Sequence, residues 1–275
     1  MYRSFASLWR YAAVLLLTIW ISPSVAVALV TWNVAELSDP NPKRIQRLLN
    51  VARSVQPDLL LLQEVESETF RALKQEKAFG PDYLLIYEER RDGLPNGGLM
   101  ILAKRELSVS QPQYHVLPSE MGRGVLMVSF AACGSHIHVA NLHLESPDLL
   151  FWRSLNFRHQ QIDRINQLTK EAPHWILAGD FNPVFERNPD HLFSEEWIDA
   201  WIEKHPRDEG LTWDPDRNAM AYQSGGFILS GYRLDRVFFK SKVFKVKEIE
   251  RLGIDAVKPL SDHYGVRVEL LCREY

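Results

Sequence analysis

The sequence is poor in the features that mark specialised structural classes. Cysteine occurs only twice in 275 residues, at Cys133 and Cys272, which is too few for a disulfide-rich scaffold or a Cys-rich zinc site. The two thiols fit either a reducing compartment or a secreted protein with at most one disulfide. Glycine and proline number only 14 and 15, and no series of long apolar runs occurs. Collagen-like chains and polytopic membrane proteins are therefore excluded.

An excess of one charge and several common catalytic signatures are also missing. The formal net charge is −3, which excludes binding of nucleic acid through an overall positive charge. Local basic contacts with nucleic acid remain possible. No H-x-x-x-H or C-x-x-C spacing occurs, which disfavours a zinc site. The absence of a G-x-S-x-G turn disfavours a serine hydrolase. The 46% apolar and 24% charged residues are ordinary for a folded protein.

The N-terminal segment has two interpretations. Basic residues precede an apolar stretch over residues 11–21, and Ala26-Val27-Ala28 follows. This pattern predicts a signal peptide or membrane-anchor-like segment over residues 1–25, and residues 11–21 would then allow membrane association. Alternatively, residues 25–30 begin the first strand, and cleavage after Ala28 would remove part of it. An exported or anchored form and an intracellular form both stay open.

The remaining chain alternates strand-like and helix-like segments. Pro42 suits a first helical turn, and residues 45–55 carry apolar side chains at helical spacing. A second helix is predicted over residues 157–168. Short apolar or β-branched runs predict strands over residues 26–34, 59–62, 99–103, 125–130, 137–142, 175–178, 233–239 and 266–271. No linker-like composition interrupts this order, so residues 26–275 are expected to form a single domain.

Polar residues follow most of these strands directly. A buried strand delivers its next polar side chain to the rim of the sheet, where several strands can build one site. Oxygen ligands and imidazoles gathered there suit a hard cation and a phosphate. Each residue taken alone also has a structural explanation, as a turn residue, half of an ion pair or a buried histidine. The ordered set favours a site: Asn33, Glu64, His143, Asp180, Asn182, Asp235, Asp262 and His263.

Six short motifs occur in a family order: Thr31-Trp32-Asn33, Leu62-Gln63-Glu64-Val65, Asn141-Leu142-His143-Leu144, Gly179-Asp180-Phe181-Asn182, Leu234-Asp235-Arg236 and Ser261-Asp262-His263. Over residues 26–271 the sequence resembles the endonuclease/exonuclease/phosphatase superfamily, which has the deoxyribonuclease I-like fold. The resemblance implies an α/β protein with a four-layer α/β/β/α sandwich. Its two packed sheets would be mixed, mainly antiparallel, and flanked by helices.

Within that superfamily the sequence is most similar to the tyrosyl-DNA phosphodiesterase 2 group, which hydrolyses the bond between a tyrosine and a DNA 5′ end. The segments that carry this similarity are His143-Leu144-Glu145-Ser146, Trp197-Ile198-Asp199-Ala200-Trp201, Leu211-Thr212-Trp213-Asp214 and Tyr232–Phe239. One departure is Pro183-Val184, where the group has an arginine. Membership of a group does not fix the substrate.

The resemblance implies a Mg²⁺ or Mn²⁺ site at Glu64, with Asn33 beside the metal or phosphate and Asp262 in support. The first motif continues as Val34-Ala35-Glu36, whereas relatives often carry Asn-x-Asp-Gly. The missing carboxylate at Ala35 leaves open whether one or two ions bind. Glu36 is not expected to replace it, because a shift of one residue points a side chain to the other face of a strand.

The resemblance also implies the catalytic roles. Asp180 would orient and deprotonate the attacking water, and Asn182 would donate a hydrogen bond to a non-bridging phosphate oxygen. His263 would hydrogen-bond the scissile phosphate, while Asp235 would orient this imidazole and hold it protonated. His143 would contact the phosphate from the opposite side of the site.

Four further residues are candidates for substrate binding. Ser146 would contact the phosphate, and Trp213 would either stack on a base or pack at the rim of a groove. Arg123 lies between two glycines and would contact a phosphate. Arg233 begins a segment, residues 233–251, with seven basic and three acidic residues. That segment would either contact a nucleic-acid backbone or form a solvated face.

Together these features predict a monomeric Mg²⁺-dependent phosphodiesterase acting on a nucleic-acid 5′ end, as a tyrosyl-DNA phosphodiesterase does. The alternative is a nuclease, or a phosphodiesterase for a lipid or small phosphoester, which an exported protein would favour. A binding module without activity is a third possibility. The filled polar positions argue against it.

Overall fold

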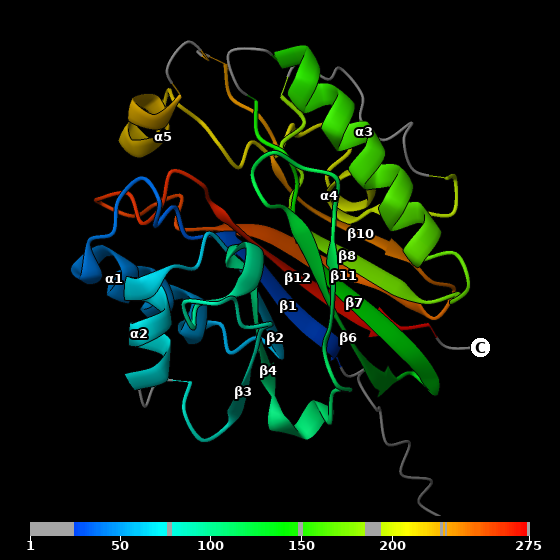
Figure 1. Cartoon of the computed structure of the whole chain (residues 1–275). Coiled ribbons are helices and arrows are strands. Elements are labelled where there is room, and N and C mark those ends of the chain that lie inside the picture. Colours follow the sequence, from blue (N-terminus) through cyan, green and yellow to red (C-terminus); the bar gives the residue numbers. More distant parts are fainter. Residues whose placement is uncertain are drawn as a thin grey trace, which may run out of the picture.

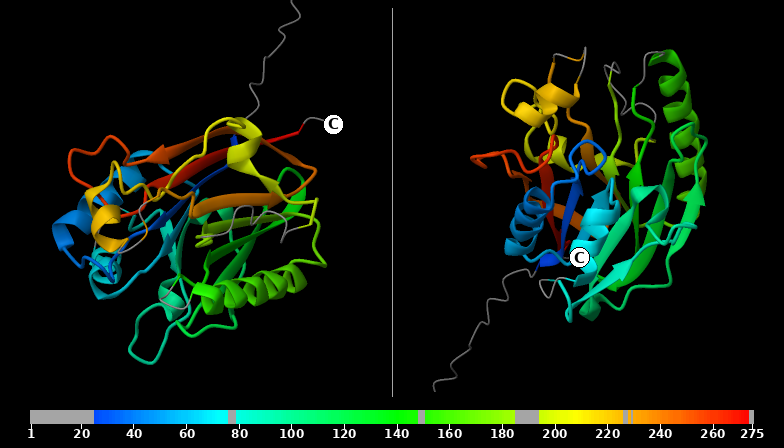
Figure 2. Two further views of the ribbon diagram at one scale, coloured as in Figure 1. Left: turned by 90° about the horizontal axis from the view of Figure 1, so that it is seen from above. Right: turned by 60° about the vertical axis from the view of Figure 1, so that its left-hand side comes forward.

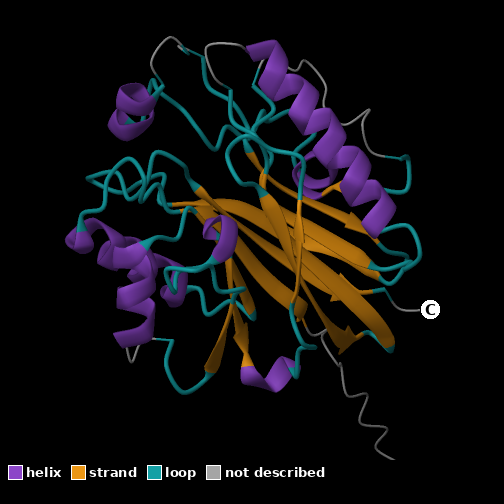
Figure 3. Ribbon diagram, in the orientation of Figure 1, coloured by secondary structure: helices purple, strands orange, loops and turns teal. Residues whose placement is uncertain are grey.

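The computed structural model describes residues 25–75, 79–147, 151–184, 194–225, 228 and 230–273. The predicted N-terminal segment therefore lies almost wholly outside the described residues. Two six-stranded sheets pack against each other, and helices lie on their outer faces (Figure 1 and Figure 3). Both sheets are mixed, and most of their strand pairs are antiparallel. The predicted four-layer sandwich is confirmed.

The first sheet has the order β11-β12-β1-β2-β4-β3. Only the β1–β2 pair in it is parallel. The strands are β1 (Val25–Asn33), β2 (Leu59–Gln63), β3 (Tyr83–Ile86), β4 (Met100–Lys104), β11 (Phe244–Leu252) and β12 (Gly265–Cys272). On its outer face lie helices α1 (Pro42–Ser54) and α2 (Ser67–Gln75).

Helix α1 forms where the sequence predicted it, for local reasons. Asn41 caps its N-terminus, because the side chain accepts hydrogen bonds from the backbone N–H groups of Lys43 and Arg44. Proline at the first position needs no intrahelical donor. The apolar side chains at helical spacing, including Ile45 and Leu48, are fully buried against the first sheet.

The second sheet has the order β5-β6-β7-β8-β10-β9. Only the β7–β8 pair in it is parallel. The strands are β5 (Gln113–Val116), β6 (Gly124–Ala132), β7 (Ser135–His143), β8 (Trp175–Asp180), β9 (Ile198–Asp199) and β10 (Asp235–Lys240). The remaining helices are α3 (Phe151–Leu168), α4 (Ala200–Lys204) and α5 (Ala219–Ser224). Two 3₁₀ turns, Asn96–Gly98 and Arg105–Leu107, flank β4.

The apolar core between the sheets is formed by alternate residues of the central strands. Leu29 and Leu61 from the first sheet pack with Val139 and Ile176 from the second. The sequence did not predict β3, β5, β9, β11, α2, α4 and α5, several of which are short. Strand β11 is long but alternates polar and apolar residues and contains a bulge after Val246, so it lacks the continuous apolar run of the other strands.

Cys133 and Cys272 form a disulfide. Cys133 lies in the turn between β6 and β7, and Cys272 ends β12, so the bond links the two sheets. The sequence left open whether these thiols are paired, because 139 residues separate them. Among the described residues no helix is both long and apolar enough to span a membrane.

Candidate active site

The ends of two parallel strand pairs bring the predicted polar residues together. In the first sheet Asn33 and Gln63 are register partners at the ends of β1 and β2, and Glu64 follows directly. In the second sheet His143 and Asp180 are register partners at the ends of β7 and β8. Because the two sheets pack face to face, both sets of strand ends meet at one edge of the sandwich, where Asn33 donates a hydrogen bond to Asp180.

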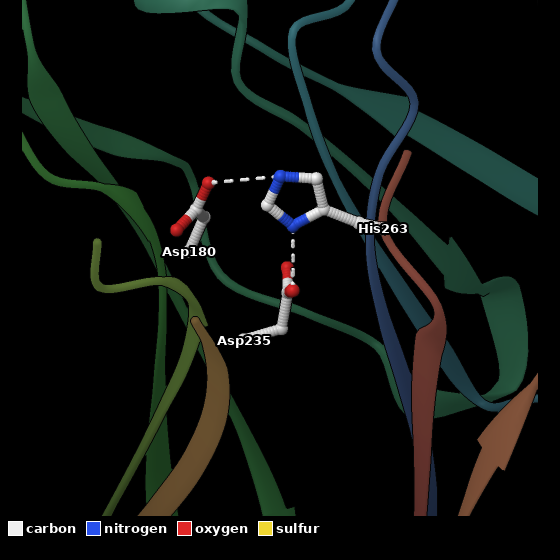
Figure 4. A group of neighbouring side chains, drawn as sticks. All are labelled: Asp180, Asp235 and His263. Atoms are coloured by element: carbon white, nitrogen blue, oxygen red, sulfur yellow. Dashed lines mark hydrogen bonds and ion pairs between the residues drawn. The ribbon is translucent and has the colours of Figure 1, made fainter. Parts of the chain in front are cut away.

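Antiparallel strands supply the other side of the site. Asp235 begins β10 directly opposite Asp180 in the sheet register. Asp262 and His263 lie just before β12. Asp180, Asp235 and His263 each offer a ligand atom within 4.8 Å of the others, and all three residues are buried (Figure 4). This group could hold a metal ion.

His263 is held between two carboxylates. Its Nδ1 lies 2.7 Å from Oδ2 of Asp235, and its Nε2 lies 3.9 Å from Oδ2 of Asp180 (Figure 4). Burial lowers the pKa of His263, but the negative charges of Asp235 and Asp180 outweigh it and raise this pKa well above its ordinary value. The imidazole is therefore protonated, and Nε2–H is its outward donor.

His143 has the opposite electrostatic setting. Its Nδ1 lies 2.7 Å from a guanidinium nitrogen of Arg123. Since arginine can only donate, Nδ1 of His143 accepts, and Nε2 carries the proton. Burial, Arg123 and His263 lower the pKa of His143 well below its ordinary value. The neutral imidazole thus presents Nε2–H toward Oδ2 of Asp180, 3.4 Å away.

Asp180 occupies the centre of this arrangement. Its Oδ2 accepts a hydrogen bond from Nδ2 of Asn33, and its Oδ1 accepts one from the backbone N–H of Asn182. Burial raises the pKa of Asp180 to about 6, although the charge of His263 opposes the shift. Nδ2 of Asn182 donates to the carbonyl of Leu144, and an amide nitrogen carries a second N–H that a phosphate can use.

Glu64 and Asp262 are the acidic pair of the site. Both line the same cavity, and burial followed by the charge of Asp262 raises the pKa of Glu64. Oε1 of Glu64 accepts a hydrogen bond from Nδ2 of Asn33. A divalent cation bound by oxygen ligands would offset this repulsion, so the donor chemistry fits Mg²⁺ or Mn²⁺.

Asn33 lies at the predicted place but turns its nitrogen to the site. Its Oδ1 accepts the backbone N–H of Ala35, while Nδ2 donates to Glu64 and Asp180. Ala35, Glu64 and Asn182 all have positive φ, of 52°, 56° and 48°. Such backbone strain in non-glycine residues is concentrated at functional sites.

Two cavities adjoin these side chains. The larger, of about 340 Å³, is lined by Asp180, His263, Ser146 and Trp213 among others. The smaller, of about 220 Å³, is lined by Arg123, Arg90, Leu37 and Met121 among others. Glu64 and His143 line both cavities. A substrate whose phosphate lies between these two residues can therefore extend to either side.

Three of the four predicted substrate-binding residues lie at these cavities, and the fourth is engaged elsewhere. Ser146 and Trp213 line the larger cavity, and Arg123 lines the smaller one. Arg233, in contrast, donates to Oδ1 of Asp199 at 2.8 Å and lines neither cavity. The substrate-binding role of Arg233 stays a prediction, and in the structure its guanidinium is engaged by Asp199 from β9.

Two buried acidic residues that support the site were not predicted. The carboxylate of Glu36 accepts backbone N–H groups of Glu66, Glu68 and Thr69, and so caps the N-terminus of α2. This contact holds together the loops that follow β1 and β2. The carboxylate of Glu36 is therefore engaged by backbone groups at the start of α2.

The second is Glu145, inside the predicted motif. Its carboxylate accepts the hydroxyl of Ser119 and the backbone N–H of Glu120. Oγ of Ser119 in turn accepts the backbone N–H of Arg123. Glu145 therefore positions Arg123 through Ser119. The only sequence pattern that could have indicated this role of Glu145 is the motif His-Leu-Glu-Ser that contains it.

Thr212 joins the two chain segments that carry the Asp235–His263 pair. Its buried hydroxyl oxygen accepts the backbone N–H groups of Leu234 and Asp235. Its carbonyl accepts the backbone N–H of Tyr264 at 2.7 Å. The Thr-Trp-Asp element thus supports the geometry of the Asp235–His263 pair and also places Trp213 at the cavity.

Comparisons with known proteins identify the family of the chain and several relatives. The model of the endonuclease/exonuclease/phosphatase family matches residues 30–263. Mouse sphingomyelin phosphodiesterase 2 is 26% identical over 87% of the chain, and a 5′-tyrosyl-DNA phosphodiesterase of Caenorhabditis briggsae is 24% identical over 87%. The chain spans 63% of the length of the mouse protein and 68% of the nematode one.

Solved structures show the same fold. The D. rerio TDP2 complex with a single-strand DNA product has a TM-score of 0.74 at 23% identity, covering 89% of this chain and 98% of that one. Sphingomyelinase C from Streptomyces griseocarneus has a TM-score of 0.67 at 17% identity, covering 90% and 99%. The same fold therefore occurs in a structure that contains a single-strand DNA product and in a sphingomyelinase.

Proposed function

We propose that the chain, which belongs to the endonuclease/exonuclease/phosphatase family, is a metal-dependent phosphodiesterase. One observation carries the proposal: Oδ2 of Asp180 lies 3.4 Å from Nε2 of His143 and 3.9 Å from Nε2 of His263. A carboxylate that can accept a proton thus faces two N–H donors. This is the arrangement that water attack on an anionic phosphodiester requires.

The three side chains have different roles in this mechanism. His263 is protonated and donates from Nε2 to a phosphoryl oxygen, while Asp235 holds the ring by its Nδ1–H. His143 is neutral and donates from Nε2, because Arg123 occupies its Nδ1. Asp180 orients the attacking water and takes its proton. Both donors act where negative charge increases in the transition state.

Glu64 and Asp262 would hold the Mg²⁺ or Mn²⁺ ion. When bound, the ion neutralises phosphate charge and polarises a phosphoryl or leaving oxygen. Asn33 donates its two amide N–H groups to Glu64 and Asp180, so its role is to hold these two carboxylates in place beside the metal and the phosphate. The group of Asp180, Asp235 and His263 already forms a hydrogen-bonded chain. We therefore assign the ion to Glu64 and Asp262.

The first candidate substrate is a nucleic-acid 5′ end whose phosphate carries a blocking group, such as tyrosine. The sequence motifs shared with the tyrosyl-DNA group support this candidate, as does the likeness of fold to TDP2. The larger cavity also has an apolar side, with Val184, Trp213 and Leu234, against which a base or a phenol could pack.

A second candidate is the phosphodiester of a membrane lipid. The disulfide between Cys133 and Cys272 favours it, because disulfides persist in oxidising compartments whereas protein–DNA adducts arise inside cells. The similarity to mouse sphingomyelin phosphodiesterase 2 supports the same candidate.

The test is a substrate panel with purified protein and Mg²⁺: 5′-phosphotyrosyl DNA, abasic DNA, plain DNA, sphingomyelin and bis(4-nitrophenyl) phosphate. The proposal expects EDTA-sensitive hydrolysis of the last compound and strong preference for one natural substrate. Failure to hydrolyse any diester would leave a binding module. Activity that survives EDTA would refute the metal assignment.

A further inference from the structure

Exposed apolar side chains are concentrated at one end of the molecule. Seven large apolar residues are exposed among the described parts of the chain. One of them, Ile202, lies on α4, which packs against β10 and β11. The other six lie on segments at the strand ends that carry the site: Leu37, Val116, Met121, Trp152, Tyr222 and Val257.

These six residues come from five segments, since Val116 and Met121 share the connection from β5 to β6, and we call them the apolar rim. Leu37 and Met121 line the smaller cavity. Tyr222 lies on α5, whose last residue lines the larger cavity, and Val257 lies in the loop that leads to Asp262. The loop after β1, helix α5 and the loop after β11 lie at the same end in both views of Figure 2.

The degree of exposure is unusual for a surface that contacts only water. Val257 is 100% exposed, Val116 73% and Tyr222 67%. Single exposed apolar residues are ordinary, but a group that surrounds a functional site indicates an interaction surface. Each such side chain gains about 1.5–3 kcal/mol when it is removed from water. Six at one end would therefore make a strong contact.

We propose that the apolar rim docks onto a lipid surface, so that the site faces a phosphodiester in the headgroup layer. This inference rests on the proposed phosphodiesterase function and names its substrate class. The rim residues come from separate segments that share one end of the molecule, which suits a flat, deformable partner. Insertion of isolated apolar and aromatic side chains into the interface is how peripheral proteins bind membranes.

The charges near the rim are mixed, which fits a zwitterionic headgroup layer. Exposed Lys258 and Arg217 lie close in sequence to exposed Asp255 and Asp216. Headgroups that carry both charges, as those of phosphatidylcholine and sphingomyelin do, meet such a rim without net repulsion. A nucleic-acid surface would need a mainly cationic rim, because phosphate neutralisation dominates that affinity. The apolar rim thus favours the lipid candidate over the DNA end.

The test compares a rim variant, Val116→Thr/Tyr222→Ser/Val257→Ser, with the control Ile202→Ser. None of these positions lines either cavity of the site. Vesicles of phosphatidylcholine, sphingomyelin and phosphatidylserine serve as the probe, with binding measured by co-sedimentation in EDTA. Turnover is measured on the same vesicles with Mg²⁺ and on soluble bis(4-nitrophenyl) phosphate.

The rim variant should bind vesicles at least tenfold more weakly and hydrolyse vesicle sphingomyelin at least tenfold more slowly. Its turnover of the soluble diester should stay within twofold of the unmodified chain, as should every property of Ile202→Ser. Equal vesicle binding by the rim variant would overturn the docking proposal. So would loss of single-strand DNA binding in place of vesicle binding.

Failure of the underlying function gives a different result. If the unmodified chain hydrolyses neither the soluble diester nor sphingomyelin, the phosphodiesterase proposal fails, while rim-dependent vesicle binding can still be observed. If it hydrolyses the soluble diester but does not bind vesicles, only the docking proposal fails.

Discussion

His263 and Asp235 form a buried hydrogen bond of 2.7 Å between Nδ1 and Oδ2. The two residues come from different sheets, since Asp235 begins β10 and His263 precedes β12. Their contact therefore depends on the packing of one sheet on the other. It also sets the charge of the imidazole, because the neighbouring carboxylates keep its pKa high.

The first prediction concerns that hydrogen bond. Asp235→Asn preserves the shape of the side chain but removes the charge that favours the imidazolium. We expect kcat for bis(4-nitrophenyl) phosphate to fall by about 10²- to 10⁴-fold, the usual contribution of an acid–base group. Circular dichroism should show an unchanged fold. Glu250→Gln, on the partly exposed Arg267 pair, is the control and should retain full activity.

The second prediction concerns the acceptor of the water proton. Asp180→Asn removes the acceptor yet can still receive the hydrogen bond from Asn33. Steady-state kinetics should show a loss of about 10²- to 10⁴-fold in kcat. His263→Ala should cause a loss of similar order, with folding retained in both variants. Unchanged turnover in either one is the result that contradicts the assigned roles.

The third prediction concerns the metal. EDTA should abolish turnover, and added Mg²⁺ should restore it. Glu64→Gln should raise the Mg²⁺ concentration needed for half-maximal rate by at least tenfold, since a neutral amide is a poorer ligand for a hard cation. Glu68→Gln, on the surface of α2, is the control in the same titration. An unchanged Mg²⁺ requirement in Glu64→Gln would move the ion to other ligands.

The fourth prediction concerns stability. Glu36→Ala leaves three backbone N–H groups near the start of α2 without their acceptor. Because such unsatisfied groups are costly, urea unfolding should show a loss of about 2–4 kcal/mol in the free energy of unfolding. Glu36→Gln keeps one carbonyl oxygen and should lose less. If both variants are as stable as the unmodified chain, the capping contact does not stabilise the fold.

The fifth prediction concerns the disulfide. Cys133→Ser/Cys272→Ser should lower the free energy of unfolding by about 2–4 kcal/mol, because the bond closes a long loop. Turnover of the soluble diester should not change, since the bond lies near the start of β7 and at the end of β12. The site lies at the opposite ends of these two strands. Reductant should lower the melting temperature of the unmodified chain but not that of the double variant.

Much of the site could be predicted because its residues follow apolar strands. A residue such as Asp180 is identified by its position two residues after the apolar run Trp175–Ala178, independently of the rest of the chain. The same local logic placed α1, where cap and apolar spacing agree. It could not show that Arg233 pairs with Asp199, because no sequence pattern shows which charges meet between the segment before β10 and β9.

The sequence by itself determined the chemical groups of the site, their order and the family to which they belong, since each group ends or begins a recognisable strand. Only the tertiary structure decided their protonation and partners. The opposite charge states of His143 and His263 arise because burial and the charge of Arg123 lower the pKa of His143, whereas the charges of Asp235 and Asp180 outweigh burial and raise the pKa of His263. Cys133 pairs with Cys272 because the packing of the two sheets brings these residues together. The same packing decides which apolar side chains remain exposed in the apolar rim.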